Sequence, residues 1–169
     1  MKFINFKKNI TINLITVISI FLIDRISKIY VIKLDNNFNG AEIFSSNFLN
    51  IYLIWNEGIA FGLLSMADSE LYNFISILIS VIILVIIFMI FRAEGIKKFA
   101  LLMILGGAIG NLYDRIIFGA VPDFIDFHIG NFHWFIFNFA DVFITVGVFF
   151  MILIEFAGNN KDKSGYEKF

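Results

Sequence analysis

The chain has 169 residues, of which 59% are hydrophobic and 23 are phenylalanine, and its mean hydropathy is +0.86. This composition excludes an ordinary soluble domain and predicts a polytopic membrane protein, with residues 1–169 as one domain. The formal net charge is -1 and cysteine is absent, which excludes disulfides, a thiol nucleophile and cysteine-ligated metals. No basic patch stands apart from the predicted membrane flanks, so we expect no nucleic-acid partner.

Apolar runs predict an all-α membrane protein with four transmembrane helices. The runs cover approximately residues 10–32, 71–91, 99–118 and 135–156. At 1.5 Å rise per residue, such helices are long enough to cross a hydrocarbon core of about 30 Å. The first run follows Lys2, Lys7 and Lys8, a pattern shared with signal peptides. It is long for a signal peptide, however, and no small-residue cleavage site closes it.

The segment from Lys33 to Glu70 is the only long polar connection. Within it, Phe48 to Trp55 is rich in aromatic and β-branched residues and too short to span a membrane, so it predicts one or two short strands. The sequence NEGIAFG follows, from Asn56 to Gly62, and its glycines permit a tight turn. We therefore expect a small β-structure between the first two helices.

The second and third helices differ in what they carry. Residues 71–91 contain nothing that could do chemistry, whereas the third helix has Gly106 and Gly110 in a small-xxx-small pattern that lets another helix approach closely. This helix must end before Pro122, which forces the preceding residue toward an extended conformation. Residues 123–137 mix acids, histidines and aromatics, which favours an interfacial or re-entrant segment.

The distribution of lysine and arginine predicts the orientation in the membrane. Nine of the 13 are in the N-terminus, the short second connection and the C-terminal tail: Lys2, Lys7, Lys8, Arg92, Lys97, Lys98, Lys161, Lys163 and Lys168. The other two connections carry only Lys33. By the positive-inside rule, both termini are cytoplasmic, and residues 35–70 and 119–134 lie outside.

Several polar residues fall at a similar predicted depth in the outer half of the membrane. Counted from the inner end, Asp24 lies about 21 Å up the first helix and Asn111 about 18 Å up the third. Asp141 lies about 9 Å below the outer start of the fourth helix, and Asp123 just above it. Charged groups at membrane depth are costly and usually functional, so this coincidence predicts a single site.

The residues permit acid–base hydrolysis without a cofactor or a metal. Two carboxylates at close range cannot both ionise, so one keeps a proton while the other acts as a base toward water. Asn138 and Asp141 share a helix face at i,i+3, as do Asn111 and Asp114, with Arg115 beside them. Asparagine and arginine can orient such carboxylates or hold a peptide backbone.

Other interpretations remain open from the residues alone. His128 and His133 do not form an HExxH pair, no serine occupies a GxSxG turn, and buried carboxylates also mark proton or ion paths. A transport role and a structural or assembly role are thus alternatives to hydrolysis. Asp24 and Lys28 at i,i+4 could pair within a site, or form a cluster that snorkels at the helix end.

Five motifs in order resemble the lipoprotein signal peptidases, or signal peptidase II. They are DRISK (24–28), NEGIAFG (56–62), GGAIGNLYDR (106–115), VPDFIDF (121–127) and FNFAD (137–141). The resemblance implies four transmembrane helices with a small extracytoplasmic β-cradle. It also implies an aspartic endopeptidase of the bacterial plasma (inner) membrane that removes prolipoprotein signal peptides before a diacylglyceryl-modified cysteine. Diacylglyceryl-modified prolipoproteins and membrane lipids would be its partners, and globomycin its expected inhibitor.

The resemblance also assigns residues. Asp123 and Asp141 would form the catalytic dyad, while the residues that bind substrate or support the dyad would be Asn56, Asn111, Arg115, Asn138 and Asp24. Two positions depart from the family pattern: Arg25 replaces a usual glutamine, and Val142 follows Asp141 where serine is common. Neither departure touches the dyad, so the implied activity is unaffected.

Overall fold

Four long helices form the body of the protein in the computed structural model, which describes residues 2–38, 40–58 and 69–165. The helices are α1 (Lys2–Phe38), α2 (Ser69–Arg92), α3 (Gly95–Phe118) and α4 (Phe139–Gly165). Each contains a segment long and apolar enough to cross a membrane. The predicted four-helix membrane fold is therefore confirmed, and the chain is a multi-pass membrane protein.

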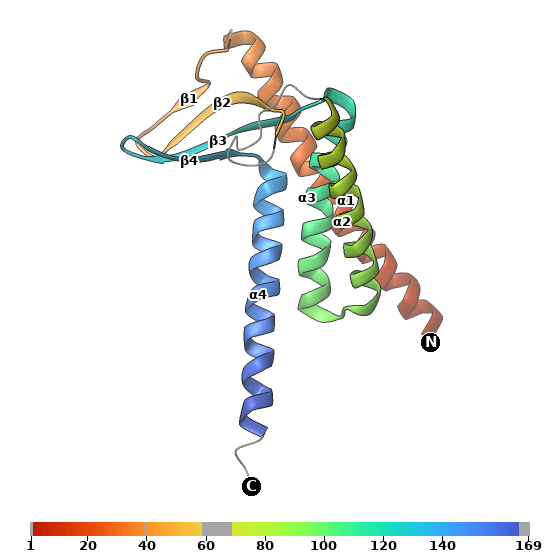
Figure 1. Cartoon of the computed structure of the whole chain (residues 1–169). Helices are drawn as coiled ribbons and strands as arrows, with labels where there is room; N and C mark the ends of the chain where they lie inside the picture. The colour runs from red at the N-terminus through yellow and green to blue at the C-terminus, as the bar shows by residue number, and fades with distance from the viewer. Residues whose placement is uncertain (1, 39, 59–68, 166–169) are drawn as a thin grey trace.

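A small antiparallel sheet lies at one end of the helices, and α4 follows directly from its last strand (Figure 1). Its strands are β1 (Phe44–Ser45), β2 (Leu49–Asn56), β3 (Val121–Ile129) and β4 (Phe132–Phe137), in that spatial order. Strand β2 confirms the strand predicted at residues 48–55. Residues 59–62 of the predicted NEGIAFG turn lie outside the described residues.

The segment predicted as interfacial is a β-hairpin. Gly119 ends α3 in the left-handed conformation (φ 70°), and its N–H donates to the Arg115 carbonyl at 3.2 Å. Strands β3 and β4 then pair through a turn at Gly130, which also has positive φ. Because residues 132–137 belong to β4, α4 begins at Phe139 rather than at the predicted Phe135. Asp141 therefore lies in the first turn of α4, closer to the helix end than predicted.

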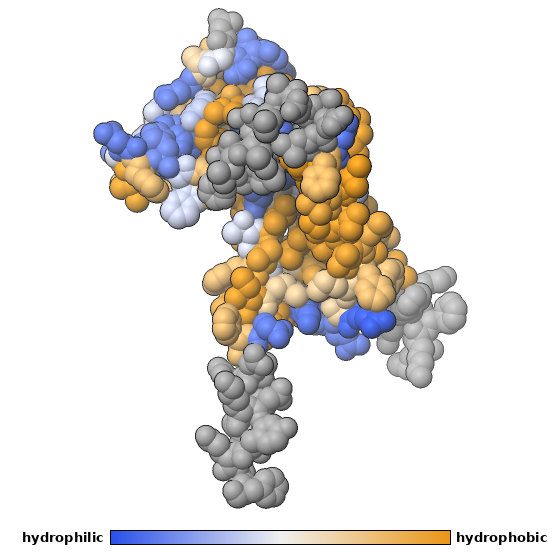
Figure 2. Space-filling model, in the orientation of Figure 1, coloured by the Kyte–Doolittle hydropathy of each residue, from blue (hydrophilic) through white to orange (hydrophobic). Residues whose placement is uncertain are grey.

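Helix α3 is the central helix and the most buried of the four spans. Its leucines pack against isoleucines of α2, including Leu101, Leu102 and Leu105 with Ile83 and Ile86. Helices α1, α2 and α4 turn apolar side chains outward, and Figure 2 shows this apolar surface over the helices. Such a surface suits a hydrocarbon environment.

Glycines on two faces of α3 allow its neighbours to approach. A Cβ at Gly106 would lie 2.8 Å from the Ile20 side chain of α1, and one at Gly107 would lie 2.5 Å from the Ala140 carbonyl oxygen of α4. A Cβ at Gly110 would lie 2.7 Å from Asp24. Small residues thus let α1 and α4 pack closely against α3.

Candidate functional site

Asp123 and Asp141 line one small cavity of about 40 Å³, large enough for a water molecule. Asp123 comes from the start of β3, and Asp141 from the first turn of α4. The cavity is lined by Asn56, Asn111, Arg115, Val121, Asp123, Phe135, Ile136 and Asp141. Two carboxylates that are 18 residues apart in the sequence thus face the same space.

The position of Asp141 follows from how α4 begins. The Asp141 N–H donates to Asn138 Oδ1 at 3.1 Å, and the Asn138 N–H donates to Asp141 Oδ2 at 3.2 Å. This reciprocal pair is a capping box, with Asn138 as the N-cap and Asp141 three residues later. The FNFAD motif therefore both caps the start of α4 and orients the Asp141 carboxylate.

Asparagine side chains hold both carboxylates. Asp123 accepts hydrogen bonds from Asn56 Nδ2 at 2.8 Å and from Asn138 Nδ2 at 2.5 Å. Asp141 accepts one from Asn111 Nδ2 at 2.8 Å. The three amides come from β2, from α3 and from the residue before α4, so each predicted asparagine contacts a predicted aspartate. Such donors stabilise the ionised form and fix its orientation.

Burial, followed by the negative charge of Asp141, raises the pKa of Asp123 to about 6. The hydrogen bonds from Asn56 and Asn138 act in the opposite direction. The Asp123 side chain is only 3% exposed, so loss of hydration disfavours its charge. A carboxyl group with a pKa near 6 can both give and take a proton under ordinary conditions.

Arg115 lines the cavity and fixes the chain beside it. One guanidinium nitrogen donates to the Gly58 carbonyl at 3.0 Å, and another reaches the Asn111 carbonyl at 3.4 Å. Gly58 lies two residues after Asn56, the last residue of β2. Arg115 therefore holds the chain that follows this strand against α3, next to the small cavity.

A buried ionic cluster lies on the far side of Asn111 from Asp141. Lys28 Nζ contacts Asp24 Oδ2 at 2.9 Å, Asn111 Oδ1 at 2.9 Å and Asp114 Oδ2 at 2.7 Å. Arg25 contacts Asp114 at 2.6 Å. Asp24 and Lys28 are fully buried, so the alternative of a cluster that snorkels at the helix end is wrong. Sequence reasoning noted their i,i+4 spacing but did not assign Lys28 to the site.

Asp24 also reaches α4. Its second oxygen, Oδ1, accepts a hydrogen bond from the Ala140 N–H at 3.0 Å. That N–H is one of the first-turn donors that lack a partner within the helix. Asp24 therefore contacts the start of α4, and it is not among the residues that line the small cavity.

The two histidines lie in the hairpin, where their rings stack with centroids 5.0 Å apart. His133 Nδ1 lies 2.8 Å from Asp126 Oδ2, which also accepts from Asn50 at 3.4 Å. Among the described residues, no group of three or more His, Cys, Asp or Glu side chains could hold a metal ion. Asp126 is thus part of the sheet's own polar network, although it is only three residues from Asp123.

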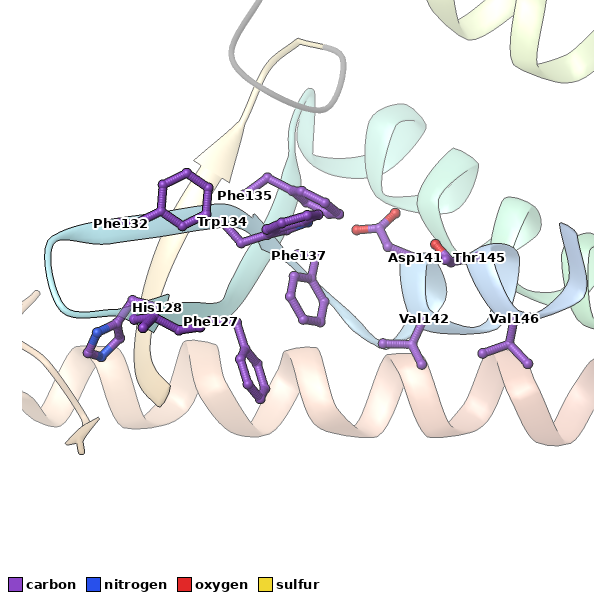
Figure 3. Close-up of a pocket in the computed structure, with 11 residues that line it drawn as sticks. Phe127, His128, Phe132, Trp134, Phe135, Phe137, Asp141, Val142, Thr145 and Val146 are labelled. Carbon is purple, nitrogen blue, oxygen red and sulfur yellow. The ribbon is translucent and has the colours of Figure 1, made fainter. Parts of the chain in front are cut away.

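A larger apolar pocket of about 470 Å³ opens beside Asp141. In Figure 3, aromatic side chains of the β3–β4 hairpin form one side, and the first two turns of α4 form the other. The lining residues are Phe127, His128, Ile129, Phe132, Trp134, Phe135, Phe137, Asp141, Val142, Thr145 and Val146. Asp141 therefore lines both the small cavity and the apolar pocket.

Comparison with known proteins identifies the family. A model of signal peptidase (SPase) II matches residues 16–157. A lipoprotein signal peptidase of Pelagibacter ubique is 51% identical over 91% of this chain and 93% of its own, and one of Aquifex aeolicus is 41% identical over 82% of each. A solved bacterial membrane enzyme superposes with a TM-score of 0.74 at 27% identity, covering 95% of this chain and 94% of its own. The chain therefore belongs to the signal peptidase II family of membrane proteases, which remove signal peptides from prolipoproteins.

Proposed function

We propose that this protein is an aspartic endopeptidase that cleaves bacterial prolipoproteins immediately before the diacylglyceryl-modified cysteine. Asp123 and Asp141 form its catalytic dyad. The observation that carries this proposal is that both carboxylates line one water-sized cavity, each held by asparagine amides. No metal or cofactor is needed, because the two carboxyl groups supply both a base and an acid.

The reaction follows from a dyad that shares one proton. The ionised aspartate takes a proton from water as the water oxygen bonds to the scissile carbonyl carbon. The protonated aspartate gives its proton to the leaving nitrogen as the C–N bond breaks, and the dyad returns to its singly protonated state. Asn56, Asn111 and Asn138 keep the carboxylates aligned during this exchange. Arg115 supports the backbone that carries Asn56.

The apolar pocket beside Asp141 supports the proposal that the substrate carries a lipid. Its volume of about 470 Å³ and its aromatic and aliphatic lining suit acyl chains of a lipid-modified cysteine or of neighbouring membrane lipids. A lipid anchor in that pocket would bring the adjoining peptide bond to the dyad. The same surfaces would accept globomycin, the expected inhibitor.

The site faces the outer leaflet of the plasma membrane in this proposal, and both termini are cytoplasmic. The start of α1 and the end of α4 both lie away from the sheet (Figure 1), which agrees with the lysine-rich ends being on one side. An outer-leaflet site would meet the lipid-modified cysteine without extracting its acyl chains.

The proposal is tested by cleavage of a diacylated lipobox peptide, read by gel shift with the purified full chain. Asp123→Asn and Asp141→Asn keep size and hydrogen bonding but remove the titrating group, so each should lose nearly all cleavage. The double variant should be little worse, because residues that act as a unit are not additive. Chelators should leave cleavage unchanged and globomycin should abolish it.

Asp126→Asn is the matched control, since it makes the same change in the same strand away from the small cavity. We expect it to retain most cleavage. An inactive Asp126→Asn beside an active Asp123→Asn would show that the wrong aspartate has been assigned. If all three single variants still cut, the protease dyad is refuted and a transport role becomes the better explanation.

A further inference from the structure

Lys28 is a buried cation whose three N–H groups all have acceptors. They point to Asp24 Oδ2, Asn111 Oδ1 and Asp114 Oδ2, at 2.9, 2.9 and 2.7 Å. Two acceptors are carboxylates of the ionic cluster, and the third is a neutral amide that belongs to the candidate site. An ammonium group with three partners from two helices has a fixed direction.

That direction determines how the Asn111 amide is turned. An ammonium group can only donate, so the Asn111 oxygen must face Lys28 and its NH₂ group must face the other way. On that other side, Asn111 Nδ2 donates to Asp141 Oδ1 at 2.8 Å. The flipped amide would place N–H groups against an ammonium and an oxygen against a carboxylate, so both contacts would become repulsive.

We propose that Lys28 is a positioning residue for the catalytic dyad, acting through the amide of Asn111. This inference rests on the proposed function, because it assigns Asp141 to the dyad. Asp24 takes part from both of its oxygens: one binds Lys28 and the other binds the Ala140 N–H. The first helix therefore fixes both the donor to Asp141 and the helical turn that carries Asp141.

The charges of the cluster provide a matched control. The cluster has two carboxylates, Asp24 and Asp114, and two cations, Lys28 and Arg25. Asp123 and Asp141 lie outside the cluster and line the small cavity. Arg25 contacts Asp114 at 2.6 Å and Asp24 at 3.5 Å. Removing either cation leaves the cluster with the same excess of negative charge, but only Lys28 contacts the Asn111 side chain, and the Lys28 charge also lowers the pKa of Asp123. A substitution that removes the Lys28 charge but keeps an N–H donor therefore separates the charge effect from the contact.

The test compares Lys28→Met, Lys28→Gln and Arg25→Gln in the purified full chain, by cleavage of the diacylated peptide at a series of pH values. Lys28→Met should lower kcat about 100-fold with little change in KM, since a misplaced catalytic group has an effect of that order. The acidic limb of its pH–rate profile should move to higher pH, because the ionised dyad loses a fixed donor. Lys28→Gln is neutral but still offers an N–H to Asn111, so it should recover at least about tenfold of that loss.

Arg25→Gln should keep kcat within about threefold of the wild type and leave the acidic limb in place. Equal losses in Lys28→Met and Arg25→Gln would show that charge balance alone matters, and would overturn the inference. A Lys28→Met profile that coincides with the wild type would also overturn it. If Lys28→Met is not monodisperse in detergent, Lys28→Gln decides: a kcat about 100-fold below that of the wild type, despite the retained N–H donor, refutes amide orientation.

Asp123→Asn assayed in parallel separates this inference from the proposed function. Cleavage by Asp123→Asn would refute the dyad itself. An inactive Asp123→Asn beside an unaffected Lys28→Met would refute only the positioning role of Lys28.

Discussion

Replacing Gly107 by alanine should damage the site through the backbone that carries Asp141. The new Cβ would lie 2.5 Å from the Ala140 carbonyl oxygen and 2.8 Å from Ile144 Cγ1. Contacts shorter than about 3.0 Å are not tolerated, so α3 and α4 must part by at least about 0.5 Å. Overpacking of this kind costs about 1–3 kcal/mol of stability.

The same displacement acts on the contact between Asn111 and Asp141. That hydrogen bond is 2.8 Å long, and stretching it by about 0.5 Å takes it beyond the usual range of N–H···O bonds. A misplacement of this order near a catalytic group can reduce the rate about 100-fold. We therefore expect Gly107→Ala to fold, with a lowered thermal midpoint, and to cleave the diacylated peptide about 100-fold more slowly.

Gly106→Ala is the matched control, because it changes the adjacent residue in the same helix. Its Cβ would meet the Ile20 side chain of α1 at 2.8 Å, so it would stress a different interface. We expect a comparable fall in the thermal midpoint in detergent with a much smaller loss of cleavage. Full activity in Gly107→Ala, or equal losses of activity in the two variants, would refute the reasoning.

Two further predictions concern pH and orientation. Burial, followed by the charge of Asp141, raises the pKa of Asp123 to about 6, so the dyad loses its shared proton as pH rises past that value. We therefore expect kcat/KM to decline on the alkaline side from about pH 6, and a flat profile would contradict this. Cysteines introduced at the exposed positions Asn47 and Lys97 should differ in labelling by an impermeant thiol reagent on intact cells, because only Asn47→Cys is expected to face outward and react. Equal labelling of both cysteines would contradict the predicted topology.

The helices and the grouping of polar residues could be predicted from the sequence because both leave strong one-dimensional signals. Long apolar runs identify spans, and the isolated charges Asp24 and Asp114 within them stand out. The hairpin at residues 121–137 was missed as β-structure because its aromatics also suit a membrane interface. Its strand character depends on pairing with β2, which is more than 60 residues away and leaves no local signal.

The contacts within the site were less accessible to sequence reasoning. Helical spacing indicated that Asn138 shares a face with Asp141, but the capping box depends on where α4 begins, and β4 determines that point. Lys28 was paired correctly with Asp24, yet its bond to Asn111 joins two helices across 83 positions. Side-chain partners between helices follow from packing, which periodicity alone does not specify.

Because Asp141 lies in the first turn of α4, local unfolding of that turn alone would disrupt the site. Helix ends fray more readily than helix centres, and here one turn carries Asp141. Four kinds of contact restrain it: the reciprocal bonds with Asn138, the bond from Asn111 to Asp141, the bond from the Ala140 N–H to Asp24, and the close approach of α3 at Gly107. Opening that single turn would withdraw the carboxylate from the cavity while every transmembrane segment stays folded, so inactivation by heat or detergent would precede loss of the helical structure.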